Sequence, residues 1–124
     1  LIQKGNQMNK MTYRQGDVGL VRMDAIPTGA KRQARKGDIV LALGEATGHA
    51  HKIKDRSAKI FNLDGQRYLV IERPTSLIQT DRTGRIGQKH DGHDLHGVVT
   101  VDPGIYEVRI ERSYERGEIV RVVD

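Results

Sequence analysis

The sequence predicts a single all-β domain, folded as a small antiparallel β-barrel or sandwich. Valine and isoleucine are plentiful, whereas windows rich in alanine or leucine, which favour helices, are rare. Short β-rich segments recur at a spacing of roughly 8–12 residues, with glycine or proline between many of them. A length of 124 residues allows one modest hydrophobic core.

The first ten residues differ from the rest of the chain. Residues 1–10 are polar and show no hydrophobic periodicity, and Met11 is a more natural start. We therefore expect residues 1–10 to be disordered or foreign to the natural protein, and residues 11–124 to form the single β domain.

Several segments are expected to form strands because they are rich in apolar or β-branched residues and end at turn-forming residues. In chain order they are Asp17–Met23, Ile39–Leu43, Ala58–Leu63, Arg67–Glu72, Ser76–Thr80, the later part of His93–Val101, Ile105–Arg112 and Glu118–Val123. Asp64-Gly65 is the strongest hairpin signal in the chain. We expect the last two segments to pair as a second hairpin around Tyr114–Gly117.

Two polar stretches are expected to be loops. Ala30–Lys36 is a loop or a short edge strand that carries four cations, Lys31, Arg32, Arg35 and Lys36. These cations are either solvated or in contact with RNA phosphates, and the lack of an interleaved aromatic residue disfavours base recognition. Thr80–Gly92 is loop-like in composition, with a short helix near residues 85–92 left open.

Composition limits the chemistry and the partners. The formal net charge of +5 permits an acidic partner such as a nucleotide or RNA without requiring one. The chain has no cysteine, so a transition metal would be held by imidazole and carboxylate, which favours zinc, iron, nickel or manganese. The sequence has no apolar run long enough for a membrane helix and no signal peptide, so we expect a cytoplasmic protein without a membrane partner.

The five histidines form two clusters that point to one site. His49 and His51 follow a predicted strand, and on a strand two residues separated by one point to the same face. His90, His93 and His96 lie in one stretch about forty positions later, as the sequence shows. A metal ion would join the two clusters.

We predict a divalent-metal site whose ligands are His49, His51, His93 and His96. His93 and His96 can both be ligands only if the backbone turns between them. Glu45 and Asp94 are nearby carboxylates that would bind the metal or orient an imidazole, with Glu45 also a candidate proton carrier. His90, beside Lys89, is the least expected member.

The histidine pattern resembles the metal site of the cupin superfamily, in which an H-x-H on a strand of a small barrel joins a histidine from a later strand. Gly44 and Gly48 precede His49 and His51, as a glycine does in the first cupin motif. The cupin glutamate after the H-x-H is missing, and Pro103-Gly104 follows the second cluster instead of preceding it. The resemblance implies a metal in the mouth of a cupin-like barrel.

Three functions follow from these residues. The first is a metal-binding protein, with metal-dependent hydrolysis or another reaction of a small substrate as its candidate activity and Glu45 and the four ligand histidines as catalytic candidates. The second is a metal-independent ribonuclease or phosphodiesterase that uses two histidines as acid and base, with Lys52, Arg82 and Arg85 holding phosphate. The third is a non-enzymatic binding or assembly module, which would self-associate through exposed strand edges.

Overall fold

The computed structural model describes residues 12–44, 48–88, 95–115 and 118–121. These residues form twelve strands and no helix, so the predicted all-β class is confirmed. The strands are β1 (Tyr13–Gln15), β2 (Val18–Met23), β3 (Lys31–Arg32), β4 (Ile39–Leu43), β5 (Ala50–Ile53), β6 (Lys59–Leu63), β7 (Gln66–Ile71), β8 (Thr75–Thr80), β9 (Val99–Val101), β10 (Gly104–Ile110), β11 (Arg112–Glu115) and β12 (Glu118–Arg121).

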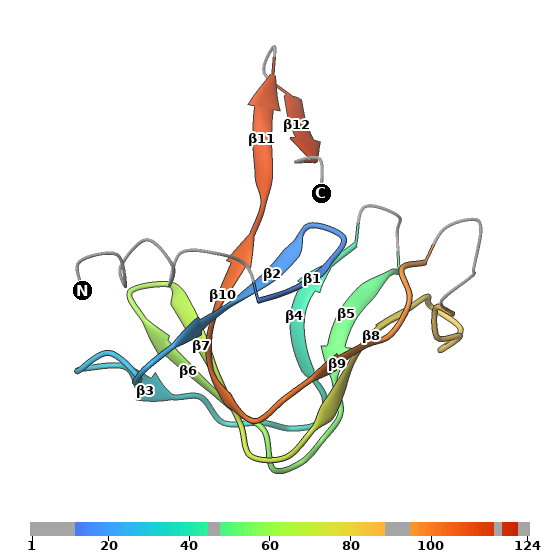
Figure 1. The fold of residues 1–124 in the computed structure, drawn as a ribbon. Coiled ribbons are helices and arrows are strands. Elements are labelled where there is room, and N and C mark those ends of the chain that lie inside the picture. Colours follow the sequence, from blue (N-terminus) through green and yellow to red (C-terminus); the bar gives the residue numbers. More distant parts are fainter. Residues whose placement is uncertain (1–11, 45–47, 89–94, 116–117, 122–124) are drawn as a thin grey trace.

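Two antiparallel sheets make up the body of the molecule (Figure 1). The larger sheet has the strand order β1-β2-β10-β7-β6-β3, and the smaller one has the order β4-β5-β8-β9. Both sheets are open, with free edges in the described part of the chain, and they do not close into a barrel. In the described residues there is no helix of the length and apolarity that a membrane crossing needs.

One hydrophobic cluster joins the two sheets. Leu20, Leu69 and Tyr106 come from the larger sheet, and Ile53 and Leu77 come from the smaller one. All five side chains are fully buried. Burial of such side chains contributes roughly 1.5–3 kcal/mol each, so this shared core helps to hold the two sheets together.

The hairpin predicted around Asp64-Gly65 is confirmed. Strands β6 and β7 pair with Leu63 opposite Gln66, which leaves a two-residue turn. Asp64 and Gly65 have φ values of 52° and 87°. A two-residue turn with both central residues at positive φ matches the right-handed twist of the strands that it joins, and Asp-Gly tolerates it well.

The predicted pairing of the last two segments is wrong. Strand β10 corresponds to the expected Ile105–Arg112 strand, but it lies between β2 and β7 in the larger sheet. The partner of β12 is β11, and this pair is joined to neither sheet and extends away from the body (Figure 1). The alternating pattern of Ile105–Arg112 identified a half-buried strand, but it carries no information on which strand lies beside it.

The remaining expectations concern short or polar elements. Strand β1 was not expected, whereas the strand expected in the later part of His93–Val101 is confirmed as Val99–Val101. Residues 85–88 form no helix. Ile86, within this range, makes an isolated β-bridge with Thr80. The short edge strand that was one expectation for Ala30–Lys36 is confirmed, because the two-residue β3 pairs with β6 at the edge of the larger sheet.

Candidate functional site

Four buried polar side chains meet where the two sheets approach each other. Gln15 ends β1, Asp17 follows in the turn to β2, His51 lies on β5, and Gln79 lies on β8. Each is at most 2% exposed. We call these four residues the polar cluster. Because burial of polar side chains costs free energy unless they are satisfied, their hydrogen bonds decide whether the cluster is stable.

Gln15 links three parts of the chain. Its side-chain Nε2 donates hydrogen bonds to the carbonyl oxygens of Leu77 and Gly97, both at 2.9 Å. Both amide hydrogens are then used, so the opposite side of the amide, Oε1, faces His51. Oε1 lies 2.8 Å from His51 Nδ1. The orientation of Gln15 therefore places the proton of His51 on Nδ1.

Gln79 approaches the other ring nitrogen. His51 and Gln79 are directly opposite each other on β5 and β8. The backbone N–H of His96 donates to Gln79 Oε1 at 2.6 Å, which turns the amide nitrogen of Gln79 toward His51 Nε2, at 3.4 Å. A ring nitrogen that faces an amide donor carries a lone pair, so the neutral Nδ1–H tautomer fits both neighbours.

A carboxylate lies close to the same ring nitrogen. Asp17 Oδ1 is 3.8 Å from His51 Nε2, and both side chains are completely buried. Asp17 is held in place through its backbone, because its carbonyl accepts a hydrogen bond of 2.7 Å from the N–H of Glu111. A buried carboxylate next to an imidazole lone pair gives this side of His51 a negative potential, which favours a cation there.

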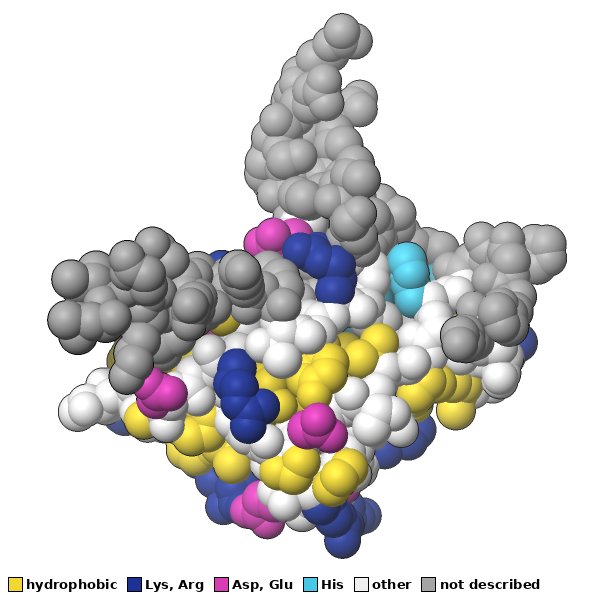
Figure 2. All heavy atoms as spheres, viewed as in Figure 1, with side chains coloured by type: hydrophobic (Ala, Val, Ile, Leu, Met, Phe, Trp, Pro, Cys, Tyr) yellow, Lys and Arg dark blue, Asp and Glu magenta, His cyan; other side chains and the backbone are white. Residues whose placement is uncertain are grey.

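The two histidine segments of the sequence meet at this cluster. The rings of His51 and His96 are stacked with centroids 6.3 Å apart and an interplanar angle of 27°. His51 is buried, whereas His96 is exposed, and histidine atoms are visible on the surface in Figure 2. The stacked pair therefore connects the protein surface, at His96, with the buried polar cluster, at His51.

Gly44 leaves room for the cluster beside β4. A Cβ on Gly44 would lie 2.7 Å from the Cβ of His49 and 2.9 Å from Nε2 of Gln79. The backbone N–H of Gly44 donates to the His49 carbonyl at 2.8 Å. The glycine that supports the cupin resemblance thus packs against the first histidine segment, where a side chain would push Gln79 out of place.

The remaining predicted site residues are distributed as follows. His49 is 7% exposed and directly precedes β5. Lys52 follows His51 on the strand and so points to the opposite face. Arg82 packs with its Cβ against Gly48. Arg85 is paired with Asp81. Glu45, His90, His93 and Asp94 lie outside the described residues.

Within the described ranges, no group of three or more His, Asp or Glu side chains is arranged to hold a metal ion. The two described imidazoles that stack therefore do not make a complete ligand set, since a zinc site has three or four protein ligands.

Sequence reasoning missed Gln15, Asp17 and Gln79. Glutamine is neither a common metal ligand nor a common catalytic base, so no motif marked the two amides. The available signal was their position: Gln79 follows the apolar pair Leu77-Ile78, and Asp17 directly precedes the apolar residues of β2. A polar residue attached to a buried strand is a candidate for a buried network.

A turn after β8 positions the second histidine segment. The carboxylate of Asp81 accepts hydrogen bonds from the Thr83 hydroxyl at 2.6 Å and from the backbone N–H groups of Thr83 and Arg85 at 2.9 and 3.0 Å. The hydroxyl of Thr83, together with these N–H groups, lowers the pKa of Asp81 to about 2. The turn leads to Gly87, whose N–H donates to the Gln79 carbonyl at 3.0 Å.

We expect this turn to loosen in acid. Because folding lowers the pKa of Asp81 from its ordinary value of 3.8 to about 2, the carboxylate stabilises the folded turn at pH values above 3.8. That contribution is lost as the pH falls through about 2. Carbon NMR of the Asp81 carboxyl and amide exchange at Thr83 and Arg85 measure both events. Asp81→Asn should remove the pH dependence, and a carboxyl that titrates at its ordinary value would contradict the prediction.

No curated protein and no solved structure is detectably similar to this chain. One protein family matches residues 14–111, a range that includes Gln15, Asp17, His51, Gln79 and His96. Since this range covers most of the 124 residues, the chain belongs to the family described as Domain of unknown function (DUF8820).

Proposed function

We propose that this protein binds a divalent transition-metal ion between β5 and the Leu95–Gly97 segment, with His51 and His96 as ligands. The observation that carries the proposal is the contact between the two imidazole rings, whose centroids are 6.3 Å apart although they come from distant parts of the sequence. Histidine is the commonest side chain to bind transition metals, and a chain without cysteine offers no thiolate alternative.

The orientation of His51 supports this proposal. Metal-bound histidines usually donate their second ring N–H to a carbonyl or a carboxylate, which fixes the ring and raises its basicity. Gln15 Oε1 accepts such a bond from His51 Nδ1 at 2.8 Å. The lone pair on Nε2 then faces the side on which Asp17 Oδ1 lies 3.8 Å away, and the Gln79 amide, 3.4 Å from the same nitrogen, would have to move aside for an ion to bind there.

Burial favours this function over the metal-independent nuclease. Acid–base cleavage of a phosphodiester needs two imidazoles within reach of the substrate. His51 is 0% exposed, so of the stacked pair only His96 is accessible. A buried histidine is a common metal ligand, and it needs no contact with a substrate.

The ligand chemistry also limits the ion. Imidazole with carboxylate oxygen suits zinc, iron, nickel or manganese. An ion with an open coordination position polarises water or an oxygen-bearing substrate, so we propose hydrolysis or binding of a small oxygen-containing molecule as its use. We also propose a cupin-like placement of the ion at one end of the two sheets, and His49 and His93 as further ligands.

Metal titration of the purified chain tests this function. Protein freed of metal by a chelator should take up about one ion per chain from a solution of Zn²⁺ or Mn²⁺, measured by equilibrium dialysis and elemental analysis. His51→Gln and His96→Ala should each weaken uptake by at least about tenfold. Lys52→Ala is the matched control, because Lys52 lies on the same strand but on the opposite face.

Circular dichroism of each variant separates loss of ligand from loss of fold. Full metal uptake by a folded double variant that lacks both His51 and His96, or a folded wild-type chain that binds none of these ions, would overturn the proposal. His93→Ala and Glu45→Gln test the other candidates in the same assay.

A further inference from the structure

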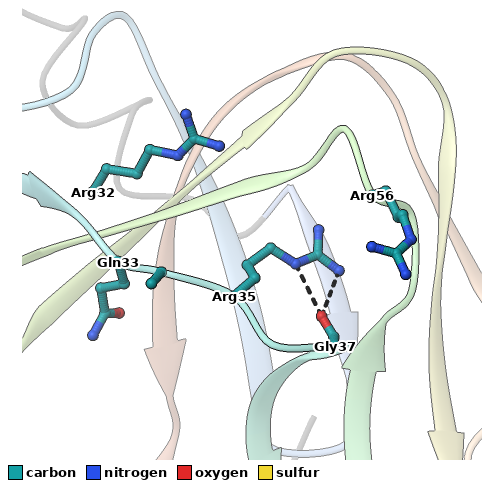
Figure 3. A pocket seen from close by; sticks show the side chains of 6 residues that line it. Arg32, Gln33, Arg35, Gly37 and Arg56 are labelled. Atoms are coloured by element: carbon teal, nitrogen blue, oxygen red, sulfur yellow. Dashed lines mark hydrogen bonds between the residues drawn. The ribbon is translucent and has the colours of Figure 1, made fainter.

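Three arginines line a hollow of about 440 Å³ (Figure 3). Arg32 comes from β3, Arg35 from the segment between β3 and β4, and Arg56 from the segment between β5 and β6. Gln33, Ala34 and Gly37 also line the hollow, and none of these described lining residues is acidic. His51 lies near the start of β5 whereas Arg56 follows its end, so the hollow is separate from the proposed metal site.

Arg35 is held rigidly by backbone carbonyls. Its Nε and Nη2 donate to the Gly37 carbonyl at 3.0 and 2.9 Å, as the dashed lines in Figure 3 show. Its Nη1 donates to the carbonyls of Asp55 and Ala58 at 2.6 and 2.8 Å. Neutral acceptors fix the guanidinium without cancelling its charge. The hollow therefore contains a preorganised cation.

The other two arginines are exposed. Among the described residues, the side chains of Arg32 and Arg56 have neither a hydrogen-bond partner nor an ion-pair partner. In Figure 3 the guanidinium groups of Arg35 and Arg56 point toward one another. Like charges brought together in a concave surface repel each other and attract an anion.

The carboxylate of Asp55, next to Arg56, already has hydrogen-bond and ion-pair partners. Asp55 accepts hydrogen bonds from Arg73 Nε at 3.0 Å and from the Ser57 hydroxyl at 2.7 Å. These two partners, with the Ser57 N–H, hold the pKa of Asp55 well below its usual range. Since its charge is matched by Arg73, Asp55 does little to neutralise the arginines of the hollow.

We propose that this hollow binds a phosphate-bearing anion. The guanidinium groups of Arg32 and Arg56 can donate pairs of parallel hydrogen bonds that fit the oxygens of phosphate, and Arg35, whose N–H groups are largely used by backbone carbonyls, adds its positive charge. None of the described lining residues is an aromatic on which a base could stack, so the proposed recognition is of the phosphate alone. A second hollow of about 510 Å³ shares Arg32 and adds Lys31, although its lining includes Asp64.

Calorimetric titration with two probes tests the proposal at low ionic strength. The first probe is inorganic pyrophosphate, and the second is a short single-stranded RNA. Arg32→Gln and Arg56→Gln should each weaken pyrophosphate binding roughly five- to tenfold, and added salt should weaken it further. Arg109→Gln is the matched control, because it removes the same charge from an arginine of β10 that is paired with Glu107 at 2.9 Å.

The two probes separate the sources of phosphate. If RNA and pyrophosphate bind with similar affinity and the same dependence on Arg32 and Arg56, the site recognises a small phosphorylated ligand. If RNA binds much more tightly with that same dependence, it recognises a nucleic-acid backbone. The proposal is wrong if neither probe binds, or if Arg109→Gln weakens binding as much as the two pocket variants do.

Discussion

Replacing Gln15 by alanine is expected to lower the free energy of unfolding by about 3–5 kcal/mol. The substitution leaves three polar groups without their hydrogen-bond partner. The carbonyl oxygens of Leu77 and Gly97 lose their donor, and His51 Nδ1 loses its acceptor. His51 is fully buried, so water cannot replace the lost partner without opening the structure. A urea titration followed by circular dichroism gives the change in the unfolding midpoint.

Gln66→Ala is the control for this experiment. The side chain of Gln66 also donates a hydrogen bond to a carbonyl, that of Val108 at 2.9 Å, but Gln66 is only half-buried and its side chain has no second bond to a described residue. Its removal should cost about 1 kcal/mol. If the two variants lose the same free energy, Gln15 does not organise the polar cluster. The Gln15 variant should also bind the proposed metal more weakly, because His51 is no longer held in one orientation.

Local patterns predicted the parts of the fold that depend on few residues. The β6–β7 hairpin could be predicted from Asp64-Gly65, because an aspartate and a glycine adopt the required positive φ values at little cost in free energy. The strand Gly104–Ile110 follows from its alternating side chains. The two strands beside it could not be predicted in this way, because β2 and β7 are far away in the sequence and are selected by the shared core.

The histidine clusters were visible in the sequence, but the groups around them were not. The proximity of His51 and His96 depends on how β5 and the Leu95–Gly97 segment pack, which no spacing rule describes. Gln15 lies in a strand of only three residues, and its role appears only when the Leu77 and Gly97 carbonyls are placed beside it. Buried polar networks are set by tertiary geometry, so residue type alone did not indicate this one.

Gly87→Ala should destabilise the protein by roughly 2–3 kcal/mol and separate the two imidazole rings. A Cβ at this position would lie 2.1 Å from the backbone oxygen of His96 and 2.9 Å from the Cβ of Leu95. Neither neighbour can yield easily, because Leu95 is buried and the N–H of His96 is bonded to Gln79. The segment must therefore move away from β8 as a whole.

Two measurements follow this movement. Urea unfolding reports the loss of stability, and NMR contacts between the ring protons of His51 and His96 should disappear because their centroids no longer lie 6.3 Å apart. Gly37→Ala is the matched control, since a Cβ there has nothing within 4 Å, and its effect should stay within about 0.5 kcal/mol. A folded Gly87 variant that keeps the ring contact and the wild-type stability would show that this close approach does not position His96. If the contact is lost and metal uptake falls with it, stacking of the two histidines is a requirement for binding, because the substitution alters neither ligand.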